Sequence, residues 1–234
     1  MSIFRPLSGR QTTPGPKPPR FSASEYHVVS FGFGRAPDAF DIAELHSELL
    51  PASPISKLGS PFMERFYYSV LPREGLIFGA VAYVRGKPAG FVSATADAEG
   101  FMGHGVRRAF PQLIYAVASS VLHSPNMALR GIWEALNLMQ KRGSGPSVGE
   151  ILSLGVRAEF RGADFRERTG VSLASELADL VTANLRKAGV RRARVIIDDD
   201  NAPAQRFYQR RGWRRTHDTV PGWTIPSIEM AIDL

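Results

Sequence analysis

A cluster of arginines before a predicted helix is the first candidate for chemistry. Arg157, Arg161, Arg166 and Arg168 lie in one short stretch, and Gly170 follows them. A helix start presents unpaired N–H groups and a partial positive charge, and glycine lets a ligand approach the backbone closely. This stretch therefore predicts an anion site suited to a pyrophosphate. The competing interpretation is a capped helix beside a solvated arginine loop.

Two regular elements would position this site. The apolar stretch 148–156 predicts a strand, and 157–169 reads as a charged loop. The strongest predicted helix spans 172–188 and ends at Gly189, after basic residues in its last turn. One face of this helix carries Leu173, Leu177, Leu180, Val181 and Leu185.

The remaining elements of the second half alternate in type. A strand is predicted over 194–197 and a short helix over 202–211, ending at Gly212. Residues 213–216 and 228–232 are predicted to be closing strands. This alternation favours an α/β or mixed α+β layered domain.

The first half predicts a strand, two helices and a hairpin. The strand spans 26–33, and Asp38 is a predicted N-cap for a helix through Leu50. A second short helix is predicted over 61–71. Strands over 76–84 and 89–95, joined by a turn, form the predicted hairpin.

The segment 96–146 changes from strand period to helical period, which predicts a helical insertion. One helix is predicted over 106–122, with Pro111 near its start, and a second apolar stripe lies within 127–140. The insertion either covers a substrate pocket, contacts a second copy in a homodimer, or packs onto the domain. Residues 1–23 are basic and rich in proline and predict a disordered leader, so the domain would span 24–234.

Composition narrows the function classes. The 234 residues carry a net charge of +7 and include no cysteine, which excludes disulfides, thiolate metal sites and a cysteine nucleophile. The five histidines show no metal-ligand spacing, so no metal is expected. No apolar run is long enough for a membrane span, and no secretory signal is present, so we expect a cytoplasmic protein. The charge suits a polyanionic ligand, and the absence of a continuous basic helix face argues against nucleic acid.

Two motifs in the second half resemble the GNAT superfamily of N-acetyltransferases. The first comprises residues 154–162 followed by 170–173, which resemble the acyl-CoA-binding motif. The second motif begins after the strand predicted over 194–197. It comprises an Asn, an Ala three residues later, a Tyr four residues after the Ala, and a Gly-aromatic pair. These residues are Asn201, Ala204, Tyr208, Gly212 and Trp213.

The resemblance implies a fold, a cosubstrate and a reaction. The fold would be a central mixed, twisted sheet flanked by helices, and the reaction would move an acetyl group from acetyl-CoA to the primary amine of a small molecule. A backbone N–H of the strand carrying Leu154, Gly155 and Val156 would polarise the thioester carbonyl. The full implied cofactor site comprises Leu154, Gly155, Val156, Arg161, Gly162, Arg166, Arg168, Thr169, Gly170, Val171, Ser172, Asn201 and Tyr208.

Two residues are candidates for proton transfer. The resemblance implies that Tyr208 protonates the departing thiolate; the alternative is a half-buried structural tyrosine. Glu150, at the start of the same strand, is placed to deprotonate the amine directly or through a water; the alternative is a carboxylate that faces solvent. Asn201 would bind the pantetheine arm, cap the following helix, or do both.

The phosphate loop departs from the family pattern. The family usually has Arg or Gln, two residues, Gly, one residue, and Gly or Ala, whereas Glu167 and Ser172 occupy the first and last of these positions here. The usual Arg-Gly pair stands earlier, at Arg161 and Gly162, so the loop is lengthened. The insertion either brings Arg166 or Arg168 to the phosphates or weakens the site. The second outcome would make the chain a catalytically silent CoA-binding or interaction module.

The first half resembles a GNAT branch found with polysaccharide and surface-sugar genes. The similarity rests on His46, the stretch 50–59 and the aromatic stretch 62–68, together with the insertion after the hairpin. It implies an amino sugar among the acceptor amines. His46 would lie on a helix that faces the acceptor, or be a structural histidine.

Overall fold

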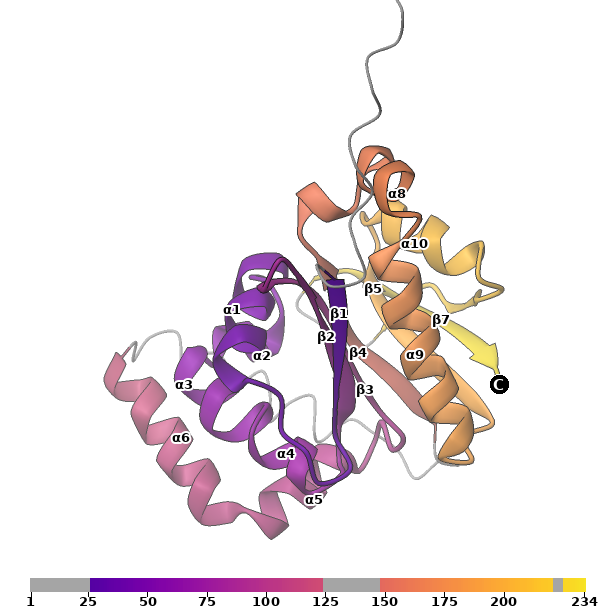
Figure 1. Cartoon of the computed structure of the whole chain (residues 1–234). Coiled ribbons are helices and arrows are strands. Elements are labelled where there is room, and N and C mark those ends of the chain that lie inside the picture. Colours follow the sequence, from indigo (N-terminus) through magenta and orange to yellow (C-terminus); the bar gives the residue numbers. More distant parts are fainter. Residues whose placement is uncertain (1–25, 124–147, 221–224) are drawn as a thin grey trace, which may run out of the picture.

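A central sheet organises the chain. The structure, a computed structural model, describes residues 26–123, 148–220 and 225–234 (Figure 1). In these residues a seven-stranded sheet has the order β1-β2-β3-β4-β5-β7-β6, with β4 and β5 parallel and the other neighbours antiparallel. The strands are β1 (Tyr26–Phe31), β2 (Phe78–Val84), β3 (Lys87–Thr95), β4 (Gly149–Val156), β5 (Arg192–Asp198), β6 (Arg214–His217) and β7 (Ser227–Asp233). The predicted mixed sheet is confirmed.

Helices cover both faces of this sheet (Figure 1). One face is covered by α1 (Ala39–Leu49), α2 (Pro54–Lys57), α3 (Ser60–Phe62), α4 (Val70–Arg73), α5 (Phe101–Arg108) and α6 (Phe110–His123). The other face is covered by α9 (Leu173–Lys187), with α8 (Ala163–Thr169) and α10 (Ala202–Gln209) nearby. Each face has its own apolar core, and the neighbours Phe91 and Val92 of β3 belong to opposite cores because side chains alternate along a strand.

The predicted helix signals hold at α1 and α9. The Asp38 carboxylate accepts from the N–H groups of Phe40 (3.0 Å) and Asp41 (3.2 Å), as an N-cap should. The apolar stripe of α9 is buried against the sheet except for the half-buried Leu180, and Gly189 follows the helix with a φ of 77°. That left-handed conformation is one that glycine adopts without strain.

The segment 61–71 is not the single helix that the sequence predicted. The structure has α3, then a π-helical turn over Met63–Tyr67, then α4. The N–H of Tyr68 donates to the carbonyl of Met63, five residues earlier, at 2.8 Å. Phe66, Tyr67 and Tyr68 are all buried. An α-helix would point three successive side chains about 100° apart, so the wider turn helps to bury all three.

Two further boundaries differ from expectation. The single helix predicted over 106–122 is two helices, α5 and α6, which break at Ala109. In a continuous helix the Pro111 ring would clash with the carbonyl of Arg107, whereas a first turn tolerates proline. The charged loop predicted over 157–169 contains a 3₁₀ turn (Ala158–Phe160) and α8, because Phe165 packs edge-on against Phe160 and is buried.

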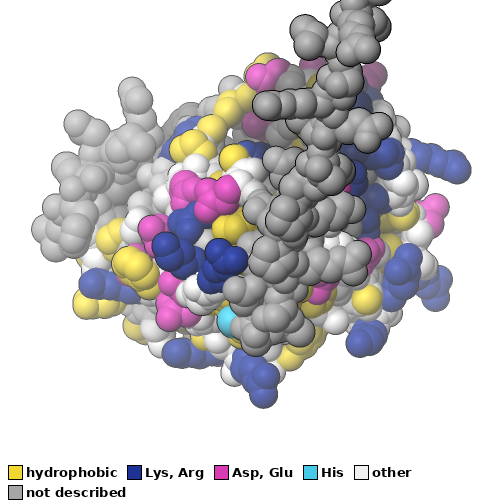
Figure 2. Space-filling view, turned by 45° about the horizontal axis from the view of Figure 1, so that its top comes forward, with side chains coloured by type: hydrophobic (Ala, Val, Ile, Leu, Met, Phe, Trp, Pro, Cys, Tyr) yellow, Lys and Arg dark blue, Asp and Glu magenta, His cyan; other side chains and the backbone are white. Residues whose placement is uncertain are grey.

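Parts of the expected domain organisation lie outside the described residues. These are the leader 1–23, the apolar stripe within 127–140 and the linker 141–146. None of the helices that the structure describes is long and apolar enough to cross a membrane. Acidic and basic side chains are intermingled on the face shown in Figure 2, so the positive charge does not gather there in one patch.

Candidate active site

The site begins where two parallel strands separate. β4 and β5 pair at only three positions, which are Gly149 with Ala193, Glu150 with Arg194, and Ile151 with Val195. Beyond these pairs the two strands diverge, although each continues to its own C-terminal end. The divergence leaves one edge of β4 without a neighbouring strand inside a buried sheet.

A β-bulge marks the same point of β4. Ser93 of β3 lies opposite Ser153, but the next residue, Ala94, lies opposite Ile151, so Leu152 is an extra residue. The bulge reverses the alternation of side chains. Leu152 packs against the core under α1, whereas Leu154, two residues later, packs against the core under α9. The part of β4 after the bulge is therefore the part that diverges from β5.

Backbone donors of β4 point into this opening. The N–H of Arg157 donates to the carbonyl of Ala89 on β3 at 2.9 Å. Because N–H groups alternate between the two edges of a strand, the N–H of Gly155 also faces β3. Those of Leu154 and Val156 face the opposite edge, where β5 is no longer paired. Two donors are therefore directed at the space between the strands.

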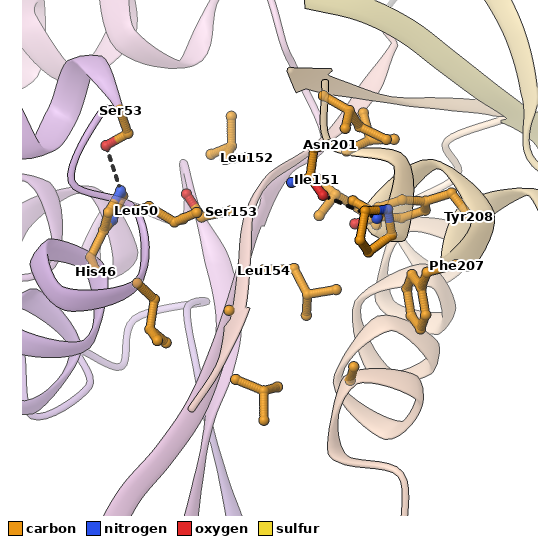
Figure 3. A pocket seen from close by; sticks show the side chains of 18 of the residues that line it. His46, Leu50, Ser53, Ile151, Leu152, Ser153, Leu154, Asn201, Phe207 and Tyr208 are labelled. Carbon is orange, nitrogen blue, oxygen red and sulfur yellow. Dashed lines mark hydrogen bonds between the residues drawn. The ribbon is translucent and has the colours of Figure 1, made fainter. Parts of the chain in front are cut away.

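A cleft of about 1070 Å³ fills this space and extends to both sides of β4. Figure 3 shows side chains of α1 such as His46 on one side of the strand, and side chains of α10 such as Tyr208 on the other. The predicted site residues that line the cleft are Glu150, Leu154, Gly155, Val156, Arg161, Gly162, Arg166, Val171, Ser172, Asn201 and Tyr208.

The end of the cleft at the start of α9 has the chemistry of an anion site, and we call it the anion-binding end. Ser172 occupies the N-cap position, but its hydroxyl donates to Ser175 Oγ (3.0 Å) and does not cap the helix. Arg161, Arg166 and Arg210 line this end, and within the described residues their side chains have no hydrogen-bond or ion-pair partner. Free N–H groups and unpaired guanidinium groups fit a pyrophosphate.

Sequence reasoning missed Arg210 and placed three residues differently. Arg210 follows α10, and its signal was its position just before the Gly-aromatic pair. Thr169 and Gly170 do not line the cleft: Thr169 Oγ1 accepts from the Val171 N–H at 3.0 Å, and Gly170 ends α8 with a φ of 75°. Arg168 belongs to α8, and its side chain lies outside the described part of the structure.

Tyr208 lines the cleft with a nearly buried ring. Its exposed fraction is 4%, and it packs edge-on against Trp213 and Phe207. In the described residues its hydroxyl has no hydrogen-bond partner. Burial raises the pKa of the Tyr208 phenol well above its usual value, and the charge of Arg211 acts in the opposite direction. The phenol is thus protonated and able to donate into the cleft.

Glu150 is a buried carboxylate, so the alternative of a solvent-facing residue is wrong. Its exposed fraction is 4%, and its carboxylate accepts from Nε of Arg194 at 2.8 Å. Glu150 lines the cleft beside the last paired residues of β4 and β5. Asn201 also lines the cleft, and its side chain caps α10 by accepting from the Ala204 N–H at 3.1 Å.

His46 lies at the other side of β4 and is fully buried. Its Nδ1 lies 2.5 Å from the Tyr68 hydroxyl, and its Nε2 lies 2.9 Å from Ser53 Oγ. Ser53 donates onward to Ser56, which donates to the Leu50 carbonyl, so Nε2 is best assigned as the protonated nitrogen. Burial lowers the pKa of His46 to about 3, so the ring is neutral at physiological pH.

Comparison with known proteins agrees with this geometry. Residues 42–213 match the model of the acetyltransferase (GNAT) family. No curated protein sequence matches the chain significantly. Similar solved structures include an agmatine N-acetyltransferase (TM-score 0.52, 18% identity, covering 89% of this chain and 100% of that chain). Another is Arabidopsis thaliana Naa50 in complex with the bisubstrate analogue CoA-Ac-MVNAL (TM-score 0.50, 16% identity, covering 88% and 99%).

The diverging parallel strands and the arginine-lined start of α9 leave room and positive charge for an acyl-CoA. The family match covers most of the chain, and the chain belongs to the GNAT acetyltransferase family. It is an N-acetyltransferase that uses acetyl-CoA as its cosubstrate. At these identities the solved structures show the shared fold alone.

Proposed function

We propose that the protein transfers the acetyl group of acetyl-CoA to the primary amine of a small molecule, within the cleft between β4 and β5. The observation that carries the proposal is the divergence of these strands after Ile151 and Val195. It exposes the N–H groups of Leu154 and Val156 to one edge, where either can donate to the thioester oxygen as that oxygen gains negative charge.

We assign the phosphates of acetyl-CoA to the start of α9. The N–H groups after Ser172 and the side chains of Arg161, Arg166 and Arg210 supply the positive potential there. Asn201 lines the same cleft, where its amide can donate to the pantetheine arm while its oxygen caps α10. The lengthened loop therefore retains arginines in the cleft, which disfavours a silent binding module.

The reaction needs one proton acceptor and one donor. Glu150, directly or through a water, takes a proton from the ammonium form of the acceptor, and the neutral amine attacks the thioester carbon. The carbon–sulfur bond then breaks, the thiolate leaves towards Tyr208, and the second amine proton passes to the thiolate or to solvent, which leaves the neutral amide and coenzyme A. Because burial raises the pKa of the phenol, complete transfer of its proton is unfavourable. Tyr208 acts mainly by hydrogen bonding to the thiolate as negative charge develops.

Titration calorimetry with acetyl-CoA and a thiol-release assay with a panel of amines test the proposal together. We expect binding, and thiol release that depends on the amine. Binding without release for any amine would favour the silent module, and no binding would overturn the proposal. An amino sugar belongs in the panel because of the resemblance of His46 and residues 50–68 to the polysaccharide-associated branch. We further propose a cytoplasmic location. We also propose that residues 96–146 contact a second copy in a homodimer, and light scattering would measure that oligomeric state.

A further inference from the structure

A chain of polar side chains runs through the core under α1. The Tyr68 hydroxyl lies 2.5 Å from Nδ1 of His46, and Nε2 of His46 lies 2.9 Å from Ser53 Oγ. Ser53 Oγ donates to Ser56 Oγ at 3.0 Å, and Ser56 Oγ donates to the carbonyl of Leu50 at 2.8 Å. His46 and Tyr68 are fully buried, so water does not compete for their hydrogen bonds and the orientation of the imidazole ring is fixed.

This chain holds the short connection between α1 and α2. We call residues 50–53 the α1–α2 segment. At its start, the N–H of Leu50 donates to the carbonyl of His46 at 2.9 Å. At its end, Ser53 is the N-cap of α2 and accepts from the N–H of Ser56 at 3.0 Å. The imidazole of His46 therefore ties the far end of the segment to the core of the domain.

The α1–α2 segment is a wall of the cleft, because each of its residues lines that space. Figure 3 shows Leu50 and Ser53 on the side of β4 that faces away from Tyr208. Leu49, which ends α1, packs directly on β4: a Cβ atom added to Gly155 would lie 2.9 Å from Leu49 Cδ1. The segment thus begins beside the part of β4 whose N–H groups face the opening.

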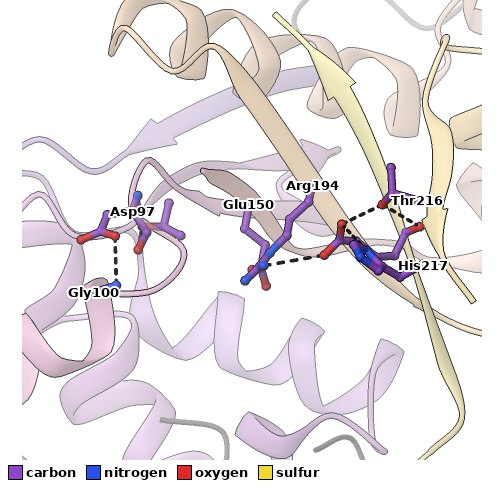
Figure 4. Close-up of polar contacts among 8 residues, drawn as sticks. Asp97, Gly100, Glu150, Arg194, Thr216 and His217 are labelled. Carbon is purple, nitrogen blue, oxygen red and sulfur yellow. Dashed lines mark hydrogen bonds and ion pairs between the residues drawn. The ribbon is translucent and has the colours of Figure 1, made fainter. Parts of the chain in front are cut away.

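The proposed base lies on the same side of β4 as this segment. Ile151 belongs to the core under α9, and side chains alternate along a strand, so the neighbouring Glu150 points towards the α1 layer. Its carboxylate accepts from Arg194 there (Figure 4). In the proposed reaction the acceptor amine reaches Glu150, whereas the cosubstrate runs from the start of α9 past Tyr208. The acceptor therefore enters on the α1 side and meets the α1–α2 segment.

We propose that His46 is a positioning residue for the acceptor. Its fully buried ring has no surface to offer a substrate. It acts through Ser53, which it holds together with the α1–α2 segment in the position against which the acceptor binds. The inference rests on the proposed function, because that function makes the α1 side of β4 the acceptor side.

Steady-state kinetics of His46→Leu test this role. Leucine keeps much of the packing but removes both side-chain hydrogen bonds. The segment contacts the body of the acceptor in the ground state and the transition state alike. Its displacement should therefore raise the acceptor KM by about tenfold, while kcat and the Kd for acetyl-CoA change by less than about threefold. His46→Gln keeps an N–H donor near the position of Nε2 and should restore most of the acceptor affinity. An unchanged acceptor KM in folded His46→Leu enzyme, or an equal loss of acetyl-CoA affinity, would overturn the inference.

A second variant tests the route through Ser53. Ser53→Ala should raise the acceptor KM by about threefold to tenfold. It breaks the same contact as His46→Leu, so the two effects should not multiply in the double variant. Effects that do multiply would show that the residues act separately, which contradicts the proposed route. Ser53→Ala also decides the question if His46→Leu does not fold, because an unchanged acceptor KM in Ser53→Ala would by itself refute the inference.

Leu45→Ala is the matched control for loss of core packing. Leu45 is fully buried on the same helix and does not line the cleft, so its truncation should lower Tm without raising the acceptor KM. A rise in KM as large as that of His46→Leu would assign the effect to packing and remove the special role of His46. The wild-type enzyme separates the two proposals: thiol release with an amine supports the proposed function whatever the variants do, and its absence with every amine overturns both.

Discussion

Tyr208 illustrates how burial limits a catalytic side chain. Its ring is held by Trp213 and Phe207, so Tyr208→Phe keeps the packing and removes only the hydroxyl. We expect turnover to fall by roughly 10²-fold, while the Kd for acetyl-CoA changes little. Steady-state kinetics and calorimetry measure the two effects. Tyr115→Phe, on the exposed surface of α6, is the control. Near-normal turnover of Tyr208→Phe would mean that the thiolate leaves without help from the phenol.

Arg194 should hold the Glu150 carboxylate in place for proton transfer. Its Nε lies 2.8 Å from the buried carboxylate, so Arg194→Gln loses a charged donor and should lower kcat/KM by roughly tenfold or more. Glu150→Gln removes the base and should lower the rate most at low pH, where more of the acceptor amine is protonated. Arg215→Gln, which loses an exposed pair with Asp199, is the control. A kcat/KM near the wild-type value in folded Glu150→Gln enzyme would assign the base to another group.

His46 should make folding stability depend on pH. The folded protein holds the ring with a pKa of about 3, whereas the unfolded chain has the ordinary value near 6.5. Between these values the unfolded state binds more protons, so the free energy of unfolding falls as pH decreases, by up to about 1.4 kcal/mol per pH unit. Urea unfolding from pH 4.5 to 7.5 measures the slope. His46→Gln should have a shallower slope, and an identical slope would contradict the assignment.

At the scale of elements, α8 is a helix in a stretch whose arginines predicted a loop. Phe165 gives the helix a buried contact, and Gly170 ends it. Gly170→Ala should lower the free energy of unfolding by about 1 kcal/mol, because a φ of 75° is strained for a residue that has a Cβ atom. The space around Gly170 is open, so a steric clash does not add to this cost. Gly103→Ala, inside α5 and also in open space, should be neutral or stabilising. Equal effects in chemical denaturation would show that backbone strain is not the cause.

The order of elements could be predicted, but the construction of the cleft could not. The apolar stripe of α9, the cap at Asp38 and the motif from Asn201 to Trp213 are local patterns, and each appears as expected. The bulge at Leu152 and the contact of Arg194 with Glu150 depend on which strands become neighbours. That pairing joins residues far apart in the sequence, and a single sequence carries no pattern for it.

At the scale of the whole molecule, the cleft is bordered by both hydrophobic cores. Leu152 packs with the core under α1, whereas Leu154 packs with the core under α9, and both line the cleft. A ligand between the diverging strands therefore contacts elements from both layers. Its binding energy should stabilise the domain as one cooperative unit, because only the folded chain brings these elements together.

Acetyl-CoA should therefore raise the stability of the entire domain. At a concentration of about 100 times Kd, the free energy of unfolding should increase by about 2.7 kcal/mol. Thermal unfolding with increasing acetyl-CoA measures the effect as a rise in Tm that continues beyond saturation. Arg210→Ala should shift this titration to higher acetyl-CoA concentrations, because one of the guanidinium groups that line the anion-binding end is lost. Arg73→Ala, in α4 and away from the cleft, is the matched control and should leave the titration in place. A Tm that does not respond to acetyl-CoA would contradict binding between the two layers, and a response confined to one of two transitions would show that the cores unfold separately.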